Sequence, residues 1–175
     1  MITIPISAKD IEWAKRKTIE FDAQKTHNKY DCEHNYFGIL GEKIFNDWLN
    51  KYNVPHEWVD FIKTDYNSPD FIINDFSIDL KTTIGTALMV SKIQFDYYIF
   101  SRVNEDVKEL FLISFISGDR LRKLIDQNKC NILQKENGIN YLCPIDKMSP
   151  ITELFNELFK DKDEWTELLK ETAIY

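Results

Sequence analysis

Cysteine, long apolar runs and excess positive charge are all scarce in this chain of 175 residues. Its three cysteines, Cys32, Cys130 and Cys143, are odd in number and widely separated. Such a set argues against a disulfide framework and for a reducing, cytoplasmic setting. No apolar run approaches the ~20 residues of a membrane span, so we expect no contact with a membrane. The first residues lack a basic region followed by a long apolar stretch, so we expect no signal peptide.

A zinc site has little support in the sequence. Cys32 and His34 lie close together, with His27 nearby, but no second pair of ligands follows at zinc-finger spacing. We therefore interpret these side chains as ordinary loop residues.

The shortage of positive charge bears on nucleic-acid binding. The chain has 22 basic and 29 acidic residues, for a net charge of −7, whereas phosphate binding rests on lysine and arginine. Residues 146–175 alone hold eight acidic and four basic residues. Lys15, Arg16 and Lys17 cluster near the N-terminus. They are candidate phosphate contacts, although the pattern favours a solvated helix face as their explanation.

What the chain does contain is enough apolar surface for one globular domain spanning residues 1–175. Hydrophobic residues make up 43% and aromatic residues 14%. Ser7 and Asp10 form a capping box that predicts an N-terminal helix over about 8–23. Ser149 followed by Pro150 predicts the start of C-terminal helices over about 150–172. Between them the patterns predict a helix at 35–52, a strand near 56–63, central strands at 95–103 and 110–116, a short helix at 118–125 and a hairpin at 130–143.

The stretch from residue 68 to residue 83 predicts a tight strand pair. Two apolar runs, Phe71-Ile72-Ile73 and Phe76-Ser77-Ile78, are separated by Asn74-Asp75, which favours a turn. Pro69 precedes the first run, where a proline is tolerated. We therefore expect a β-hairpin that brings the two ends of this stretch together.

Three charged side chains gather at the open end of that hairpin. Asp79 and Lys81 occupy alternate strand positions, so they share one face about 7 Å apart, while Ile78 and Leu80 point into a core. Asp70 begins the opposite strand. Two carboxylates and an ammonium in this arrangement suit a hard divalent metal and phosphate chemistry. The alternative is that they are solvated strand charges, because Asp-x-Lys is a common tripeptide.

Glu42 is a further candidate, on the helix predicted at 35–52. It borders the apolar stripe of that helix, where a carboxylate is partly desolvated and needs a partner. Exposure to water beside Lys43 is the alternative. Gly38 and Gly41 leave a smooth patch that another backbone can approach closely. The stripe consists of Gly41, Phe45, Trp48, Leu49 and Tyr52.

The order of these features resembles the PD-(D/E)XK nuclease superfamily. The resemblance is carried by Gly41-Glu42, Pro69-Asp70 and Asp79-Leu80-Lys81, and it covers residues 35 to about 116, the expected core. It implies an α/β fold in which a central mixed β-sheet is flanked by helices, as in restriction endonucleases. The predicted terminal helices are then extensions at both ends of this core.

The resemblance also implies a Mg²⁺- or Mn²⁺-dependent nuclease. Asp70 and Asp79 would bind the metal, with the carbonyl of Leu80 as an extra ligand. Glu42 would hold the metal through water or steer Lys81, and Lys81 would orient the attacking water. The implied substrate is DNA in preference to RNA, and endonuclease action is favoured over exonuclease action.

Further phosphate contacts are predicted next to this motif. Thr82 and Thr83 follow Lys81 directly, although threonine is also simply a good strand former. Gln94 and Tyr98 have the Gln-x-x-x-Tyr spacing of the RecB-like branch of the superfamily. Gln94 is therefore a candidate contact as well.

Two other functions remain open. The chain could be a catalytically incomplete, nuclease-like binding module, which its acidic balance favours. It could also be an acidic inhibitor or interaction protein, such as a DNA mimic, with Asp70, Asp79 and Lys81 as surface charges. A homodimer would supply two active sites for double-strand cleavage. The last amphipathic helix is a candidate interface, and core packing is the alternative for that helix.

Overall fold

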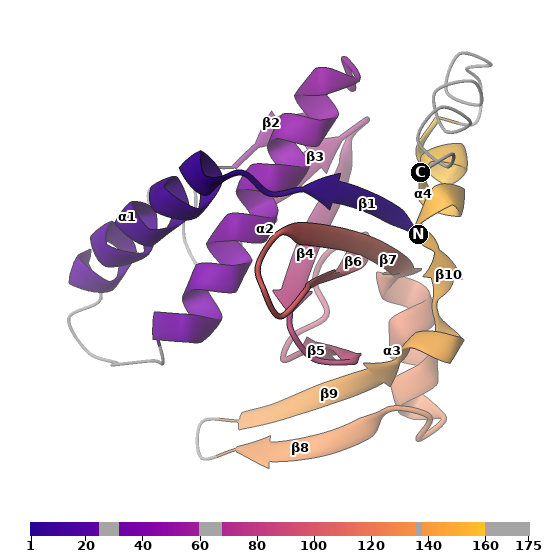
Figure 1. Cartoon of the computed structure of the whole chain (residues 1–175). Helices are drawn as coiled ribbons and strands as arrows, with labels where there is room; N and C mark the ends of the chain where they lie inside the picture. The colour runs from indigo at the N-terminus through magenta and orange to yellow at the C-terminus, as the bar shows by residue number, and fades with distance from the viewer. Residues whose placement is uncertain (25–31, 60–67, 136–137, 160–175) are drawn as a thin grey trace.

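The predicted α/β class and central mixed sheet are confirmed in the computed structural model, which describes residues 1–24, 32–59, 68–135 and 138–159 (Figure 1). The described helices are α1 (Ala8–Gln24), α2 (Cys32–Lys51), α3 (Gly118–Asp126), α4 (Ile151–Leu158) and the 3₁₀ turn η1 (Ile145–Lys147). The strands are β1 (Ile2–Pro5), β2 (Glu57–Trp58), β3 (Phe71–Ile73), β4 (Phe76–Thr83), β5 (Ala87–Val90), β6 (Tyr97–Val103), β7 (Glu109–Ser117), β8 (Asn131–Lys135), β9 (Gly138–Pro144) and β10 (Ser149–Pro150).

The strands form two sheets. The main seven-stranded sheet has the order β1-β7-β6-β4-β3-β2, with β10 also paired to β7. Within it only β4 and β6 run parallel, and a parallel connection needs a crossover of a dozen or more residues. Residues 84–96 supply the crossover. They carry β5 into a separate three-stranded sheet of order β5-β9-β8.

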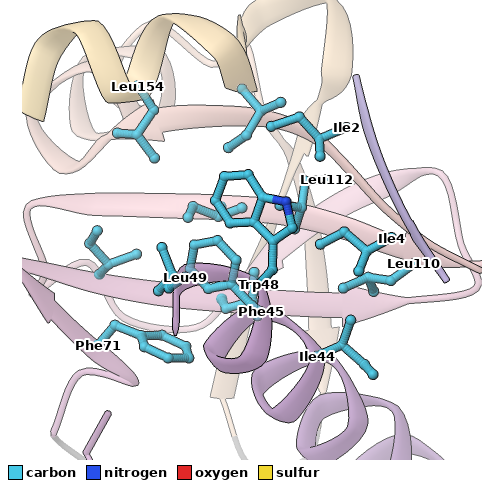
Figure 2. Packing of buried hydrophobic residues seen from close by; sticks show 14 of the residues in the cluster. Ile2, Ile4, Ile44, Phe45, Trp48, Leu49, Phe71, Leu110, Leu112 and Leu154 are labelled. Carbon is cyan, nitrogen blue, oxygen red and sulfur yellow. The ribbon is translucent and has the colours of Figure 1, made fainter. Parts of the chain in front are cut away.

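Helix α2 is fixed to the main sheet by aromatic packing (Figure 2). Trp48 lies among aliphatic side chains of β1 and β7 and packs against Phe155 of α4 in a tilted arrangement, with ring centroids 5.4 Å apart. Phe45 meets Phe71 of β3 edge to face at 5.1 Å. This buried aromatic packing holds α2 in a fixed position relative to β3 and β4.

The N-terminal helix forms as predicted. The hydroxyl and the backbone N–H of Ser7 donate to the Asp10 carboxylate at 2.6 and 3.0 Å, and the N–H of Asp10 donates to the Ser7 hydroxyl at 3.3 Å. These bonds are the reciprocal pattern of a capping box. Ala14 and Thr18 of α1 are buried, and α1 packs against α2.

The predicted cap of the C-terminal helix is wrong. Ser149 belongs to β10, where it pairs with Phe115, and its hydroxyl accepts a hydrogen bond of 2.9 Å from the Arg120 guanidinium. Helix α4 therefore begins at Ile151, after Pro150, without a side-chain cap. The predicted continuation of this helix to residue 172 falls partly on residues 160–175, outside the described residues.

The apolar stripe of α4 packs into the core. Its buried residues are Ile151, Leu154, Phe155 and Leu158, so this stripe is not presented to a second copy of the chain. Over its described residues, the last predicted helix therefore packs into the core, which was the alternative, and the homodimer itself stays a prediction.

Some predicted elements fall only partly on residues that the structure describes. Of the strand predicted near 56–63, the structure describes β2, and residues 60–67 lie outside the described residues, as does His27. Strands β1 and β5 were not predicted. In the described part of the chain, no helix is both long enough and apolar enough to cross a membrane.

Candidate active site

The predicted hairpin between β3 and β4 is confirmed. Ile73 pairs with Phe76, and the two turn residues Asn74 and Asp75 both have positive φ, of 49° and 68°. Positive φ at both central positions defines the turn type that matches the twist of paired strands. The Asn74 side chain is further held by a 2.6 Å hydrogen bond to the carbonyl of Leu158.

Asp70 lies at an irregularity just before β3. Its N–H donates at 3.0 Å to the carbonyl of Ile78, a residue that the register pairs with Phe71. Two residues thus face one, as in a β-bulge, and bulges redirect side chains next to active sites. The Asp70 carboxylate accepts a 2.6 Å hydrogen bond from the N–H of Leu80. It therefore reaches the residue between Asp79 and Lys81.

Asp79 and Lys81 form an ion pair that engages only one of the two carboxylate oxygens of Asp79. The Lys81 ammonium donates to Oδ1 of Asp79 at 2.8 Å, and the side chains are 42% and 7% exposed, respectively. Oδ2 of Asp79 is buried and has no hydrogen-bond partner among the described residues. An unpaired buried carboxylate oxygen is costly, so this atom indicates a missing partner.

Glu42 is brought next to β4 by a close helix–strand contact. A Cβ on Gly41 would lie 1.9 Å from the Thr82 hydroxyl, so only glycine allows this approach, whereas a Cβ on Gly38 would meet nothing within 4 Å. Of the two glycines predicted to allow a close backbone approach, only Gly41 is therefore in close contact with a neighbouring strand. Glu42 itself is only 8% exposed, which excludes the water-exposed alternative.

The carboxylate of Glu42 has one hydrogen-bond partner among the described residues. The indole N–H of Trp58 donates to Oε2 of Glu42 at 3.5 Å, a long hydrogen bond. Trp58 is in turn packed against Trp13 of α1, with ring centroids 5.9 Å apart. Glu42 is thus covered by Trp58 of β2, which is supported by Trp13 of α1.

Burial and mutual repulsion raise the pKa of two carboxyl groups in this cluster. Burial, and then the charge of Asp70, raise the pKa of Glu42 well above its ordinary value, against the opposing effect of Lys81. Burial and the charge of Asp79 raise the pKa of Asp70 to about 7. Burial lowers the pKa of Lys81, but Asp79 and Asp70 outweigh it and the net shift is upward. The charges of three carboxyl groups therefore act on the Lys81 ammonium, with Asp79 and Asp70 contributing most.

The donor set fits a hard divalent cation. Such cations prefer carboxylate and carbonyl oxygens, and Mg²⁺ commonly takes only one or two carboxylates, with water and phosphate completing its shell. Asp70 and Asp79 could supply the two carboxylates, and the free Oδ2 of Asp79 is suited to that role. Nowhere in the described ranges do three or more carboxylate, imidazole or thiol side chains form a group that could hold a metal. Glu42 would consequently act through water.

The predicted phosphate contacts differ in their positions. The Thr82 hydroxyl bonds to the Ser101 hydroxyl at 2.8 Å, next to Gly41, so it is engaged within the fold, and its phosphate contact stays a prediction. The Thr83 hydroxyl accepts from the N–H of Gly85 at 2.9 Å and retains its own proton to donate. Gln94 is exposed, and its backbone N–H donates to the Tyr98 hydroxyl at 2.8 Å.

The basic residues of α1 lie on its outer side. Lys15 and Arg16 are exposed, and Lys17 pairs with Glu20 at 2.6 Å. No hydrogen bond or ion pair links these three residues to Asp70, Asp79 or Glu42 within the parts of the chain that the structure describes.

Two neighbours of the cluster were missed in the sequence. Trp58 gave no signal, because its register against β3 is set by pairing that a sequence does not reveal. Tyr98 was noted only for its spacing, yet it is buried and pairs with Asp79 across β4 and β6. Its hydroxyl donates to the carbonyl of Lys92 at 3.2 Å, so it secures the loop before β6.

Comparisons with known proteins supply no relative: no family model matches the chain, and neither the curated proteins nor the solved structures contain a match.

Proposed function

We propose that this protein is a divalent-metal-dependent nuclease of the PD-(D/E)XK kind, hydrolysing phosphodiester bonds in DNA in preference to RNA. The observation that carries the proposal is the buried, unpartnered Oδ2 of Asp79, beside Asp70 and Lys81. A cation is the partner that would satisfy this oxygen and also relieve the repulsion between Asp70 and Asp79.

The residues divide into ligands and an electrostatic group. Asp70 and Asp79 would hold Mg²⁺ or Mn²⁺, with the carbonyl of Leu80 as a further oxygen and Glu42 acting through water. When bound, the ion polarises the scissile phosphate and lowers the pKa of a coordinated water. Hydrolysis breaks one P–O ester bond and leaves a phosphate monoester and a free hydroxyl.

Lys81 acts as a charged group in this proposal. Asp79 and Asp70 raise the pKa of the Lys81 ammonium in the metal-free protein, so it carries its positive charge there. It can orient the attacking water and stabilise negative charge on the phosphate as that charge develops. Its 42% exposure leaves it accessible to a substrate from solvent.

A nuclease-like binding module is the second candidate. The net charge of −7 favours it mildly, because a nuclease that binds DNA tightly is usually more basic. Such a module needs no metal. An acidic interaction protein needs neither a metal nor the buried position of Asp79. The response to divalent cations therefore separates the proposed enzyme from both.

Calorimetric titration with Mg²⁺ and Mn²⁺ tests the metal site. We expect wild-type protein to bind either ion, Asp79→Asn to bind at least tenfold more weakly, and Asp106→Asn to bind like the wild type. Asp106 is the matched control, because it pairs with Lys108 at 2.7 Å in an exposed position. Absence of binding to the wild type would remove the metal site.

Incubation with DNA tests the activity. Supercoiled, linear, branched and single-stranded DNA, each with Mg²⁺, Mn²⁺ or a chelator, cover the substrate forms that the proposal leaves open. Cleavage of at least one form, abolished by the chelator, is expected. Binding without cleavage of any form would favour the binding module.

A further inference from the structure

Strand β8 is an exposed edge with unusual apolar content. In Figure 1, β8 and β9 form a hairpin at the periphery of the molecule, with β8 on its outer side. Of the seven large apolar side chains exposed in the described residues, five lie in the three-stranded sheet or in the turn before it. These are Ile84, Met89, Ile132, Leu133 and Ile139, with Ile132 61% and Leu133 39% exposed.

The other sheet edges that the structure describes are shorter than β8. Strand β1 has four residues and ends in Pro5, β2 has only two residues, and β5 has four residues. Proteins blunt edges with prolines, charges or short strands, because an open edge recruits another strand. Strand β8 has no proline, and its only charged residue is Lys135 at its end, so residues 131–134 form an uncharged edge.

The sequence of β8 allows it to pair with a second copy of itself in an antiparallel register. Centred on Leu133, a two-fold axis sets Leu133 against Leu133 of the second copy, Ile132 against Gln134, and Asn131 against Lys135. No like charges are opposed, which matters because like charges directly across a strand pair destabilise it. Alternate residues of an edge strand direct N–H and C=O groups outward, and this register would pair them.

We propose that β8 is the dimer interface of this protein and that its partner is a second copy of the chain. The two three-stranded sheets would join through β8 into one continuous sheet with two-fold symmetry. A second copy is favoured over an unrelated strand, because the register pairs every residue of β8 without a charge conflict. The inference does not depend on nuclease activity.

The expected dimer is weak. Pairing through five residues buries less surface than a standard protein–protein interface, so the dimer should dissociate on dilution. Leu133 occupies the axis, and a lysine there would place two ammonium groups directly opposite each other.

Sedimentation velocity over a concentration series tests the proposal. Wild-type protein should shift from monomer to dimer as concentration rises, and Leu133→Lys should weaken association at least tenfold. Ile19→Lys is the matched control, since Ile19 is 70% exposed on α1, and it should behave like the wild type. A wild type that stays monomeric at its highest soluble concentration, or equal weakening by both variants, would overturn the proposal.

Cross-linking provides a test that tolerates poor folding of the lysine variant. Leu133→Cys and Ile19→Cys are each incubated with glutathione disulfide, which is reduced to two thiols as one protein S–S bond forms. Opposed non-hydrogen-bonded residues have close Cβ atoms, so Leu133→Cys should yield a covalent dimer. Ile19→Cys should give only the wild-type background. A dimeric protein whose Leu133→Cys form does not cross-link above that background has its interface elsewhere.

Discussion

Two Asp-x-Lys tripeptides in this chain show how surroundings change the same pair of side chains. Asp79 and Lys81 lie 2.8 Å apart, and Asp106 and Lys108 lie 2.7 Å apart. The second pair is exposed, and surface ion pairs contribute little. The first adjoins Asp70 and contains a buried oxygen without a partner. The proposed chemistry therefore depends on the burial of Asp79 and on the neighbouring Asp70, and the Asp-x-Lys tripeptide alone is not sufficient.

Removing the carboxylate of Asp70 should stabilise the metal-free protein at high pH. The folded-state pKa of Asp70 is about 7, above its ordinary value of 3.8, so the folded protein binds the proton more tightly than the unfolded chain does. Stability from this group is present at low pH and is lost as pH rises through about 7. Asp70→Asn should therefore melt higher than wild type at pH 8, and the gain should shrink at low pH.

Thermal melting in chelator at high and low pH measures this effect. Added Mg²⁺ should raise the melting temperature of the wild type more than that of Asp70→Asn. Asp106→Asn is the control and should show neither change. A lower melting temperature of Asp70→Asn at pH 8 would mean that the carboxylate is stabilising as it stands.

Part of this residue arrangement could be predicted from sequence. Alternate positions on a strand fix the relation of Asp79 to Lys81, and the Asn74-Asp75 turn fixes the hairpin. The bulge at Asp70 and the contact of Trp58 with Glu42 could not, because both depend on how strands pair.

At the scale of elements, the contact of α2 with β4 determines where Glu42 lies. Because a Cβ on Gly41 would overlap the Thr82 side chain, Gly41→Ala should push the helix outward and destabilise the fold by about 1–3 kcal/mol. Gly38→Ala, with open space around its Cβ, should stabilise the helix by up to about 1 kcal/mol. Urea denaturation measures both.

The same pair of variants separates positioning from stability. Gly41→Ala should also reduce cleavage, since Glu42 moves with the helix, while Gly38→Ala should leave it unchanged. Equal stability of the two variants would show that Thr82 adjusts without moving α2.

The turn between β3 and β4 offers a second test at this scale. Asp75 has φ of 68°, a conformation that aspartate tolerates and a β-branched residue does not. Asp75→Val should therefore cost roughly 1–2 kcal/mol. Asp75→Gly should fold at least as well as wild type in the same denaturation experiment. An Asp75→Val protein as stable as wild type would contradict the assigned turn.

The elements that sequence predicts best are those with a local signal. Helices α1 and α2 and the β3–β4 hairpin have a capping box, an apolar period or a turn pair. Strands β1 and β5 are four residues long and pair with β7 and β9, far along the chain. The cap predicted at Ser149 failed because Ser149 pairs with Phe115 in β10, so the helix begins two residues later, after Pro150.

The whole molecule is acidic, and this limits how it can hold DNA. With a net charge of −7, non-specific attraction to phosphates is weak, so binding should depend on the metal. Lys81→Ala, which keeps both aspartates, should therefore bind DNA more tightly with Mg²⁺ than with chelator in a fluorescence anisotropy titration. Equal binding in both conditions would indicate a surface unrelated to the cluster.

Cleavage by three proteins tests the central claim most directly: wild type, Lys81→Ala and Lys108→Ala, on a panel of DNA forms with Mg²⁺ or Mn²⁺. The wild type and Lys108→Ala should cut at similar rates. Lys81→Ala should be slower by on the order of 10²–10³-fold or more, as expected for loss of a preorganised electrostatic group, while still binding metal and melting normally. Full activity of Lys81→Ala, or a wild type that cuts no form of DNA, would contradict the account.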